Sequence, residues 1–120
     1  MNSVSKRAYG NAGEDKACEF LEERGYTTIA RNYHGGRYGE IDIVASIGNA
    51  IIFVEVKTRH NDSFGGGIYS ITANKKKHLK KAAEHFLVNN PSYNTKDFTF
   101  QFDLIIIENG KLQHVEDILR

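Results

Sequence analysis

EIDIVASIGNAIIFVEVK, which spans residues 40–57, consists of two apolar runs on either side of a Gly-Asn turn signal. Runs rich in Ile and Val around such a dipeptide are typical of a β-hairpin. A turn centred on Gly-Asn would place Asp42 opposite Glu55, and Glu40 opposite Lys57. Because side chains alternate between the two faces of a strand, we predict that these three carboxylates and one ammonium share one face.

The predicted pair of acids, Asp42 and Glu55, is electrostatically unfavourable. Directly opposed side chains lie about 5 Å apart at Cβ, and two like charges at that distance repel by about 3 kcal/mol at an effective dielectric constant of roughly 20. One carboxylate could keep its proton, Lys57 could offset the repulsion, or a divalent cation could lie between the acids. Carboxylates without neighbouring sulfur or imidazole ligands suit Mg²⁺ or Mn²⁺. The alternative interpretation is an exposed sheet face that carries mixed charges.

The composition is that of an ordinary globular domain. The chain has 120 residues, which fits one domain over residues 1–120, and its formal net charge is +1. A highly basic nucleic-acid coat is therefore excluded, and any contact with nucleic acid must come from a local patch. Cys18 is the only cysteine, which excludes an intrachain disulfide and a cysteine-based zinc site. No apolar run approaches a membrane span and no secretory signal is recognisable, so we expect a soluble, cytoplasmic protein.

Hydrophobic patterning predicts an α/β order of elements along the chain. Apolar stripes indicate helices at residues 12–24 and 72–89. The remaining expected elements are a strand at 26–32, a turn at 34–37, a hairpin over 38–58, a loop over 58–67 and a second hairpin over 98–115 with its turn at Asn109-Gly110. Strands rich in Val and Ile and covered by helices imply a three-layer α/β/α arrangement with a central mixed sheet.

An acid and a lysine are expected on the inner faces of the two helices. Glu14 precedes the apolar stripe of the first helix at helical spacing, so it could reach the acids of the hairpin. A capping box with Asn11 as N-cap explains the same spacing equally well. Lys75 lies four residues before Leu79, on the inner stripe of the second helix.

The second helix also carries a basic outer face. Five lysines against Glu84 leave a local charge of +4 over residues 72–89. Lys76 and its neighbours on this face could neutralise backbone phosphates and bind nucleic acid without sequence preference. The alternative is an ordinary solvated lysine face.

Three further residues have candidate roles beside the acids. Lys57 could orient an attacking water or neutralise charge on a phosphoryl group, or it could merely pair with Glu40. Arg59 follows on the same face and could bind phosphate through two hydrogen bonds. Asp103 interrupts an apolar strand, and we expect it to be buried in a supporting role that orients a basic side chain.

The ordered set of Glu14, Asp42 and Glu55-Val56-Lys57 resembles the PD-(D/E)xK nuclease superfamily, although Ile41 stands where that motif has proline. Within the superfamily, the chain resembles the YraN-like uncharacterised family from about residue 8 to residue 115. The matching segments are Gly10-Asn11-Ala12-Gly13-Glu14, Arg31-Asn32-Tyr33, Gly39-Glu40-Ile41-Asp42, Phe53-Val54-Glu55-Val56-Lys57-Thr58-Arg59, Lys75 with Leu79, and Phe102-Asp103.

This resemblance implies the restriction-endonuclease-like fold and kinship with Holliday-junction resolvases. By the same resemblance, Asp42 and Glu55 would bind Mg²⁺, Lys57 would assist the attacking water, and Glu14 would complete the site. We therefore expect a metal-dependent endonuclease acting on DNA, with branched or damaged DNA as candidate substrates and a homodimer where both strands are cut. The rival hypotheses are a nucleic-acid-binding module that keeps the fold without hydrolysis, and a protein-interaction domain whose acidic patch is incidental.

Overall fold

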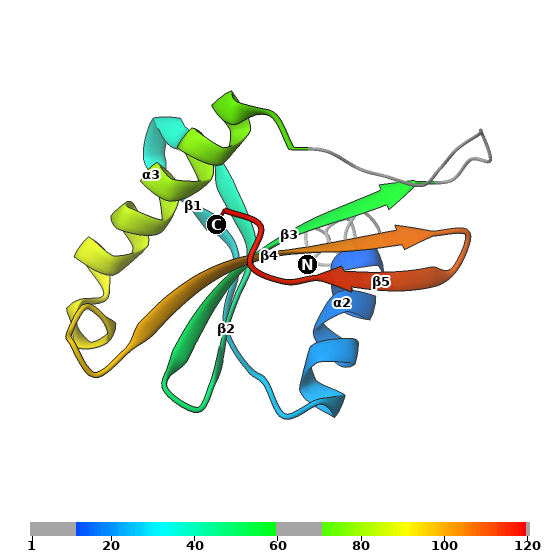
Figure 1. Ribbon diagram of the computed structural model, residues 1–120, viewed down its shortest axis with the longest axis horizontal. Helices are drawn as coiled ribbons and strands as arrows, with labels where there is room; N and C mark the ends of the chain where they lie inside the picture. The colour runs from blue at the N-terminus through cyan, green and yellow to red at the C-terminus, as the bar shows by residue number, and fades with distance from the viewer. Residues whose placement is uncertain (1–11, 60–70, 120) are drawn as a thin grey trace, which may run out of the picture.

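The computed structural model of the protein describes residues 12–59 and 71–119. Within these residues, helices and strands follow one another in the predicted order (Figure 1). The elements are α2 (Ala12–Glu23), β1 (Thr27–His34), η1 (Gly36–Tyr38), β2 (Glu40–Ile47), β3 (Ala50–Arg59), α3 (Ala73–Asn89), η2 (Pro91–Tyr93), β4 (Thr99–Glu108) and β5 (Lys111–Val115).

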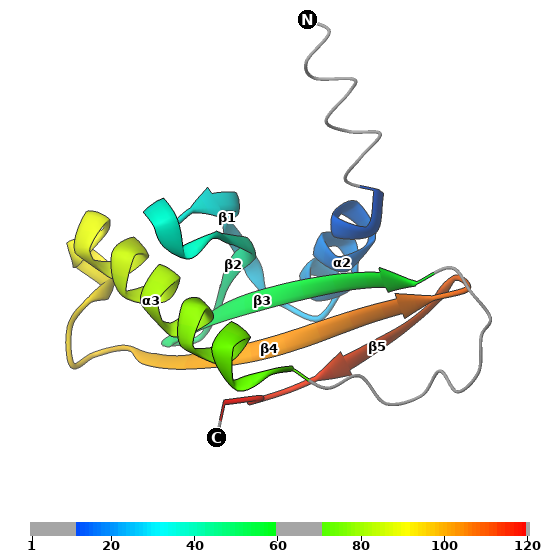
Figure 2. The ribbon, with the colours of Figure 1, turned by 90° about the horizontal axis from the view of Figure 1, so that it is seen from above.

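The strands form one five-stranded mixed sheet in the order β1-β2-β3-β4-β5. The pair β3–β4 is parallel, because α3 carries the chain back across the sheet between them, and the other neighbours are antiparallel. Both ribbon views show β3, β4 and β5 side by side (Figures 1 and 2). The predicted mixed sheet is confirmed.

The two helices cover opposite faces of this sheet. Residues Ala17, Cys18 and Leu21 of α2 pack in one buried cluster with alternate residues of β2, β3 and β4. Residues Ala82, Ala83 and Phe86 of α3 pack in a second cluster against the other face. Figure 1 shows α3 above the strands and α2 below them. Alternation along the strands therefore supplies two cores, one beneath each helix.

Both hairpin turns lie where the sequence predicts them. Ile47 pairs with Ala50, so the first turn is centred on Gly48-Asn49, and Gly48 has φ +59°. Asn109 and Gly110 both have positive φ, which suits the tight turn between β4 and β5. Thr72 caps α3, because its hydroxyl accepts a hydrogen bond from the Lys75 amide at 3.1 Å.

Two boundaries differ from the prediction, and two expectations cannot be placed. The first strand continues two residues beyond Asn32, because His34 still pairs with Glu40 of β2. The expected turn is consequently short and forms η1. The expected loop over 58–67 begins later, because Thr58 and Arg59 still belong to β3 and pair with β4. The rest of that loop lies outside the described residues, and so does the candidate N-cap Asn11.

Candidate metal centre

The two central acids lie where β2 and β3 separate. Pairing between these strands extends from the turn to Ile43 opposite Val54 and ends there, one position before Asp42. Beyond that point, Oδ2 of Asp42 accepts a hydrogen bond of 2.8 Å from the Val56 amide. Asp42 and Glu55 are therefore not the directly paired residues that a regular hairpin predicts, because the Asp42 carboxylate bonds to the β3 backbone beyond the end of the ladder.

Strand β2 also changes the faces of its side chains at this point. Ile43 packs in the cluster beneath α2, whereas Ile41 packs in the cluster beneath α3. Residues two positions apart in a regular strand would share a face. Asp42 lies between them, and its bond to Val56 shows that the carboxylate extends sideways toward β3.

Asp42 is half-buried, and charged groups from all three layers lie near its carboxyl group. Burial raises the pKa of Asp42 to about 7, although the hydrogen bond from Val56 acts in the opposite direction. The charges of Glu55 and Glu14 raise this pKa further, and Lys75 of α3 lowers it. The sheet, α2 and α3 thus each place a charged group close to the same carboxyl.

Glu55 is buried and has two ammonium groups beside it. Its Oε2 atom lies 3.5 Å from Nζ of Lys75 and 3.7 Å from Nζ of Lys57. The inward direction predicted for Lys75 is confirmed, and so is the shared face of Glu55 and Lys57. A buried carboxylate needs such partners, because an uncompensated charge in a desolvated position is strongly unfavourable.

Glu14 approaches the sheet from the first turn of α2. A Cβ atom on Gly13 would collide with Oγ1 of Thr58, so the start of this helix packs closely against the end of β3. Oε1 of Glu14 is buried and makes no hydrogen bond within the described residues, although Nη2 of Arg31 lies 3.7 Å away. The same guanidinium pairs more closely with Asp15, at 2.8 Å.

The remaining candidates lie on three elements, β3, α3 and β2. Arg59, at the end of β3, pairs with Glu108 of β4 at 3.7 Å. Lys76 is half-buried next to Lys75 at the start of α3. Glu40, which the hairpin register predicts opposite Lys57, lies opposite His34 of β1 and pairs with its ring at 3.4 Å. The reason is that β2 has already left β3 before it reaches Glu40.

Asp103 belongs to a separate cluster on the α2 face of the sheet. Its carboxylate is fully buried and lies 2.8 Å from Nε2 of His114. It also accepts hydrogen bonds from the Gln101 side chain and the Asp117 amide, both at 2.9 Å. The His114 ring makes an edge contact with Phe20 of α2. Asp103 thus holds a histidine and the C-terminal segment in place, on the face opposite Glu55.

Sequence comparison places the protein among known relatives. The profile of the uncharacterised protein family UPF0102 matches residues 13–107. This chain belongs to the UPF0102 family. A UPF0102 protein of Caldicellulosiruptor saccharolyticus is 41% identical over 115 residues, covering 96% of this chain and 94% of the relative. A second, from Brachyspira hyodysenteriae, is 42% identical over 121 residues, covering 96% of this chain and 98% of its own length.

A third UPF0102 protein, from Neisseria gonorrhoeae, is 42% identical over 102 residues, which cover 85% of each chain. The expected membership of the YraN-like family is confirmed by these matches. The family description and the names of the relatives state no activity.

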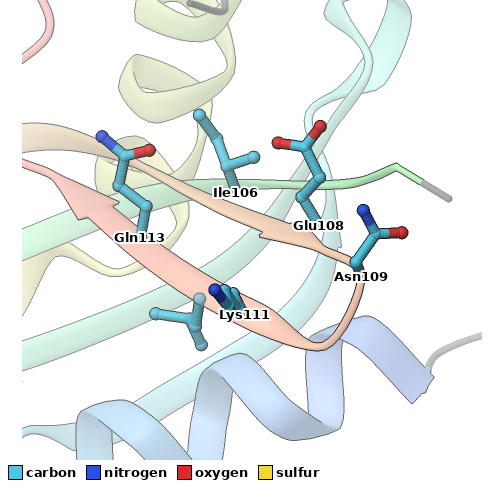
Figure 3. A pocket seen from close by; sticks show the side chains of 6 residues that line it. Ile106, Glu108, Asn109, Lys111 and Gln113 are labelled. Atoms are coloured by element: carbon cyan, nitrogen blue, oxygen red, sulfur yellow. The ribbon is translucent and has the colours of Figure 1, made fainter. Parts of the chain in front are cut away.

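Two hollows of this UPF0102 chain lie near the ends of β3 and β4. A hollow of about 200 Å³ lies between the start of α2 and the end of β3, where Lys16, Thr58 and Arg59 are among its lining residues. A larger cavity of about 470 Å³ lies on the β4–β5 hairpin (Figure 3), lined by Ile106, Glu108, Asn109, Lys111, Leu112 and Gln113. The smaller hollow presents two cationic side chains, those of Lys16 and Arg59.

The protein ligands for a cation are few. Within residues 12–59 and 71–119, no three Asp, Glu, His or Cys side chains converge closely enough to enclose a metal ion by themselves. An Mg²⁺ site does not need such a cage, because this ion keeps several waters and is usually held by one or two carboxylates together with substrate phosphate.

Sequence reasoning assigned no role to Arg31 or to the Val56 amide. Arg31 is a charged residue within a predicted strand, and this could have indicated its ion pairs with α2. The Val56 amide left no signal, because it becomes a donor only where two strands separate. Among the described residues, no helix has both the length and the apolar character that crossing a membrane requires.

Proposed function

We propose that this protein is a Mg²⁺-dependent nuclease that hydrolyses phosphodiester bonds of DNA, in the manner of the PD-(D/E)xK superfamily. The observation that carries the proposal is the meeting of Asp42, Glu55 and two lysine ammonium groups at the point where β2 and β3 separate. The three-layer arrangement with a mixed five-stranded sheet supports a restriction-endonuclease-like fold.

The residues present fit a hard divalent cation. Asp42 and Glu55 supply carboxylate oxygens, and the buried Oε1 of Glu14 has no hydrogen bond among the described residues that would compete with a metal-bound water. Burial and neighbouring acids raise the pKa of Asp42, so a cation would relieve a repulsion that the fold maintains. When bound, Mg²⁺ would polarise a phosphoryl group and lower the pKa of a bound water.

The basic side chains near the acids would contact the phosphates of the substrate. Lys57 and Lys75 each hold an ammonium within 3.7 Å of Glu55, so both can reach charge that develops on phosphoryl oxygens beside it. Arg59 and Lys16, at the hollow beside α2, would bind a neighbouring backbone phosphate. Lys76 would extend this contact along α3, giving salt-dependent affinity.

One observation favours a second candidate, a DNA-binding module that does not hydrolyse. Both lysines pair with Glu55, so the buried carboxylate is already compensated by residues of the chain itself. A site whose charges are balanced in this way could persist after loss of catalysis, while α3 still contacted phosphates.

The deciding experiment measures nicking of labelled junction, flap, linear and single-stranded DNA with Mg²⁺, Mn²⁺ or EDTA. We expect cleavage that requires a divalent cation and that falls at least about 100-fold in Asp42→Asn and in Lys57→Ala. The matched control is Asp97→Asn, an exposed aspartate in the turn before β4, which should cleave like the wild type. Cleavage that survives both site substitutions would reject the nuclease, and metal-independent binding without cleavage would support the module.

A further inference from the structure

Three consecutive residues of β1, Arg31-Asn32-Tyr33, connect both helices to the strand that carries Asp42. Arg31 pairs with Glu14 and Asp15 of α2. Tyr33 contacts α3 on the opposite face, where its hydroxyl lies 2.6 Å from Nδ1 of His85. Adjacent odd-numbered residues of one strand should share a face, but these two face opposite layers.

The backbone of Asn32 accounts for this change of face. Asn32 has φ +51°, in the left-handed region that interrupts the regular alternation of a strand. Pairing with β2 continues on both sides of it, from Arg31 opposite Ile43 to Tyr33 opposite Ile41. The two strands therefore change faces together, at one step.

This change of face occurs at the level of Asp42, the candidate site residue of β2. The register that links Arg31 to Ile43 and Tyr33 to Ile41 places Asp42 level with Asn32. Asp42 is also the residue whose carboxylate extends sideways to the Val56 amide. If β2 alternated regularly, Ile41 and Ile43 would pack in the same core and the Asp42 side chain would lie on the other face of the sheet. Asp42 could not then bond to Val56 while Ile41 and Ile43 filled separate cores.

We infer that Asn32 is a positioning residue, whose left-handed backbone turns β1 and β2 together and so directs the Asp42 carboxylate toward β3 and the acid site. Arg31 and Tyr33 hold the two sides of this step against α2 and α3. The inference rests on the proposed function only for its consequence in metal binding, since the geometry itself can be tested without metal or DNA.

The direct readout is the hydrogen-exchange protection of the Val56 amide, measured by NMR without metal. Glycine adopts positive φ readily and β-branched residues do not, so the variants are Asn32→Gly and Asn32→Val, with Asn32→Ala if the valine variant does not fold. We expect Asn32→Gly to keep the protection within about twofold, and the valine or alanine variant to lose at least about tenfold relative to the Val54 amide.

Asn109 provides a matched control, because it is an asparagine with the same φ of +51° in the β4–β5 turn, which meets β3 at Arg59, three residues beyond Val56. Asn109→Val carries the same backbone conflict and should leave the Val56 amide unchanged. Unchanged Val56 protection in the folded Asn32→Val or Asn32→Ala protein would overturn the inference, and so would an equal loss in Asn109→Val.

A second readout uses Mn²⁺ alone as the probe. Calorimetric affinity for Mn²⁺ should fall at least about tenfold in Asn32→Val and stay near the wild-type value in Asn32→Gly. Wild-type protein that binds no Mn²⁺ would count against the proposed function. The hydrogen exchange of the Val56 amide would still decide the role of Asn32.

Discussion

At the scale of single residues, the site depends on charges that the fold keeps in unfavourable surroundings. Asp42 is half-buried beside Glu55 and Glu14, with one backbone amide and the Lys75 ammonium to oppose them. Such a carboxyl destabilises the metal-free protein once it ionises. An ionisable group that a fold holds in such unfavourable surroundings is expected where binding or catalysis depends on its charge.

The sign of the pH effect follows from the raised pKa of Asp42. Because its folded pKa is about 7 against an ordinary value of 3.8, the folded state holds a proton that the unfolded state releases between these values. The free energy of unfolding in EDTA should therefore fall as the pH rises from about 4 to about 7, by at most about 4 kcal/mol from this group.

The Asp42→Asn variant isolates that contribution, because an amide oxygen can still accept from Val56 without ionising. Chemical denaturation in EDTA should show the variant to be more stable than the wild type at pH 8, by about 2 kcal/mol, with the difference vanishing near pH 4. If the free energies of unfolding of the two proteins changed in parallel with pH, Asp42 would ionise freely in the folded state and the prediction would be wrong.

Either of the two lysines beside Glu55 should be able to compensate its buried charge alone. Lys57→Ala or Lys75→Ala alone leaves one ammonium near the buried carboxylate, so each should cost less than about 1 kcal/mol of unfolding free energy at pH 8. The double variant leaves Glu55 uncompensated and should cost at least about 1 kcal/mol more than the sum. The control is the same cycle in a Glu55→Gln background, where the costs should add; additivity with Glu55 intact would contradict shared compensation.

At the scale of elements, most of the secondary structure follows from local patterns. The Gly48-Asn49 and Asn109-Gly110 turns, the apolar alternation of β3 and β4 and the stripe of α3 are all local signals, and the elements lie where they predict. The change of face in β1 and β2 was not predictable in this way. It arises from one left-handed residue, Asn32, inside a strand that continues beyond it.

A close approach between η1 and α3 was also invisible in the pattern. Gly35 is buried at φ −96°, and an added Cβ would lie 2.7 Å from Cβ and 2.8 Å from Cα of Ala82. Gly35→Ala should therefore destabilise the protein by about 2 kcal/mol in chemical denaturation, through displacement of α3. Gly110→Ala is the control, because open space surrounds it and only its positive φ of +82° opposes a side chain. A Gly35→Ala cost no larger than that of Gly110→Ala would show that α3 adjusts freely.

At the scale of the whole molecule, the candidate site exists only when all three layers are assembled. The sheet contributes Asp42 and Glu55, α2 brings Glu14, and α3 brings Lys75. The sequence predicted the shared face of Glu55 and Lys57 and the inward direction of Lys75 from strand alternation and helix spacing. For Glu14 it left the acid site and a helix cap equally open. It did not predict the separation of β2 from β3, because a regular hairpin register continues through Asp42 and Glu55.

The separation of the strands replaces a direct acid pair with a carboxylate bonded to the β3 backbone. It also explains why Glu40 faces β1, since a strand that has left β3 has only one neighbour. Both outcomes depend on which strand β2 faces beyond Ile43, a tertiary feature that the regular hairpin register does not contain.

The position at which Mn²⁺ binds on the folded protein tests the proposed metal site most sharply. Substoichiometric Mn²⁺ added to ¹⁵N-labelled protein broadens the amide signals nearest the bound ion. If these acids hold the ion, Asp42, Glu55 and Val56 broaden first, the Thr95–Asp97 turn at the far end of β4 remains sharp, and Glu55→Gln weakens the effect. Broadening centred on another part of the molecule, or none before the whole spectrum fades, would contradict the claim that these acids hold a divalent cation.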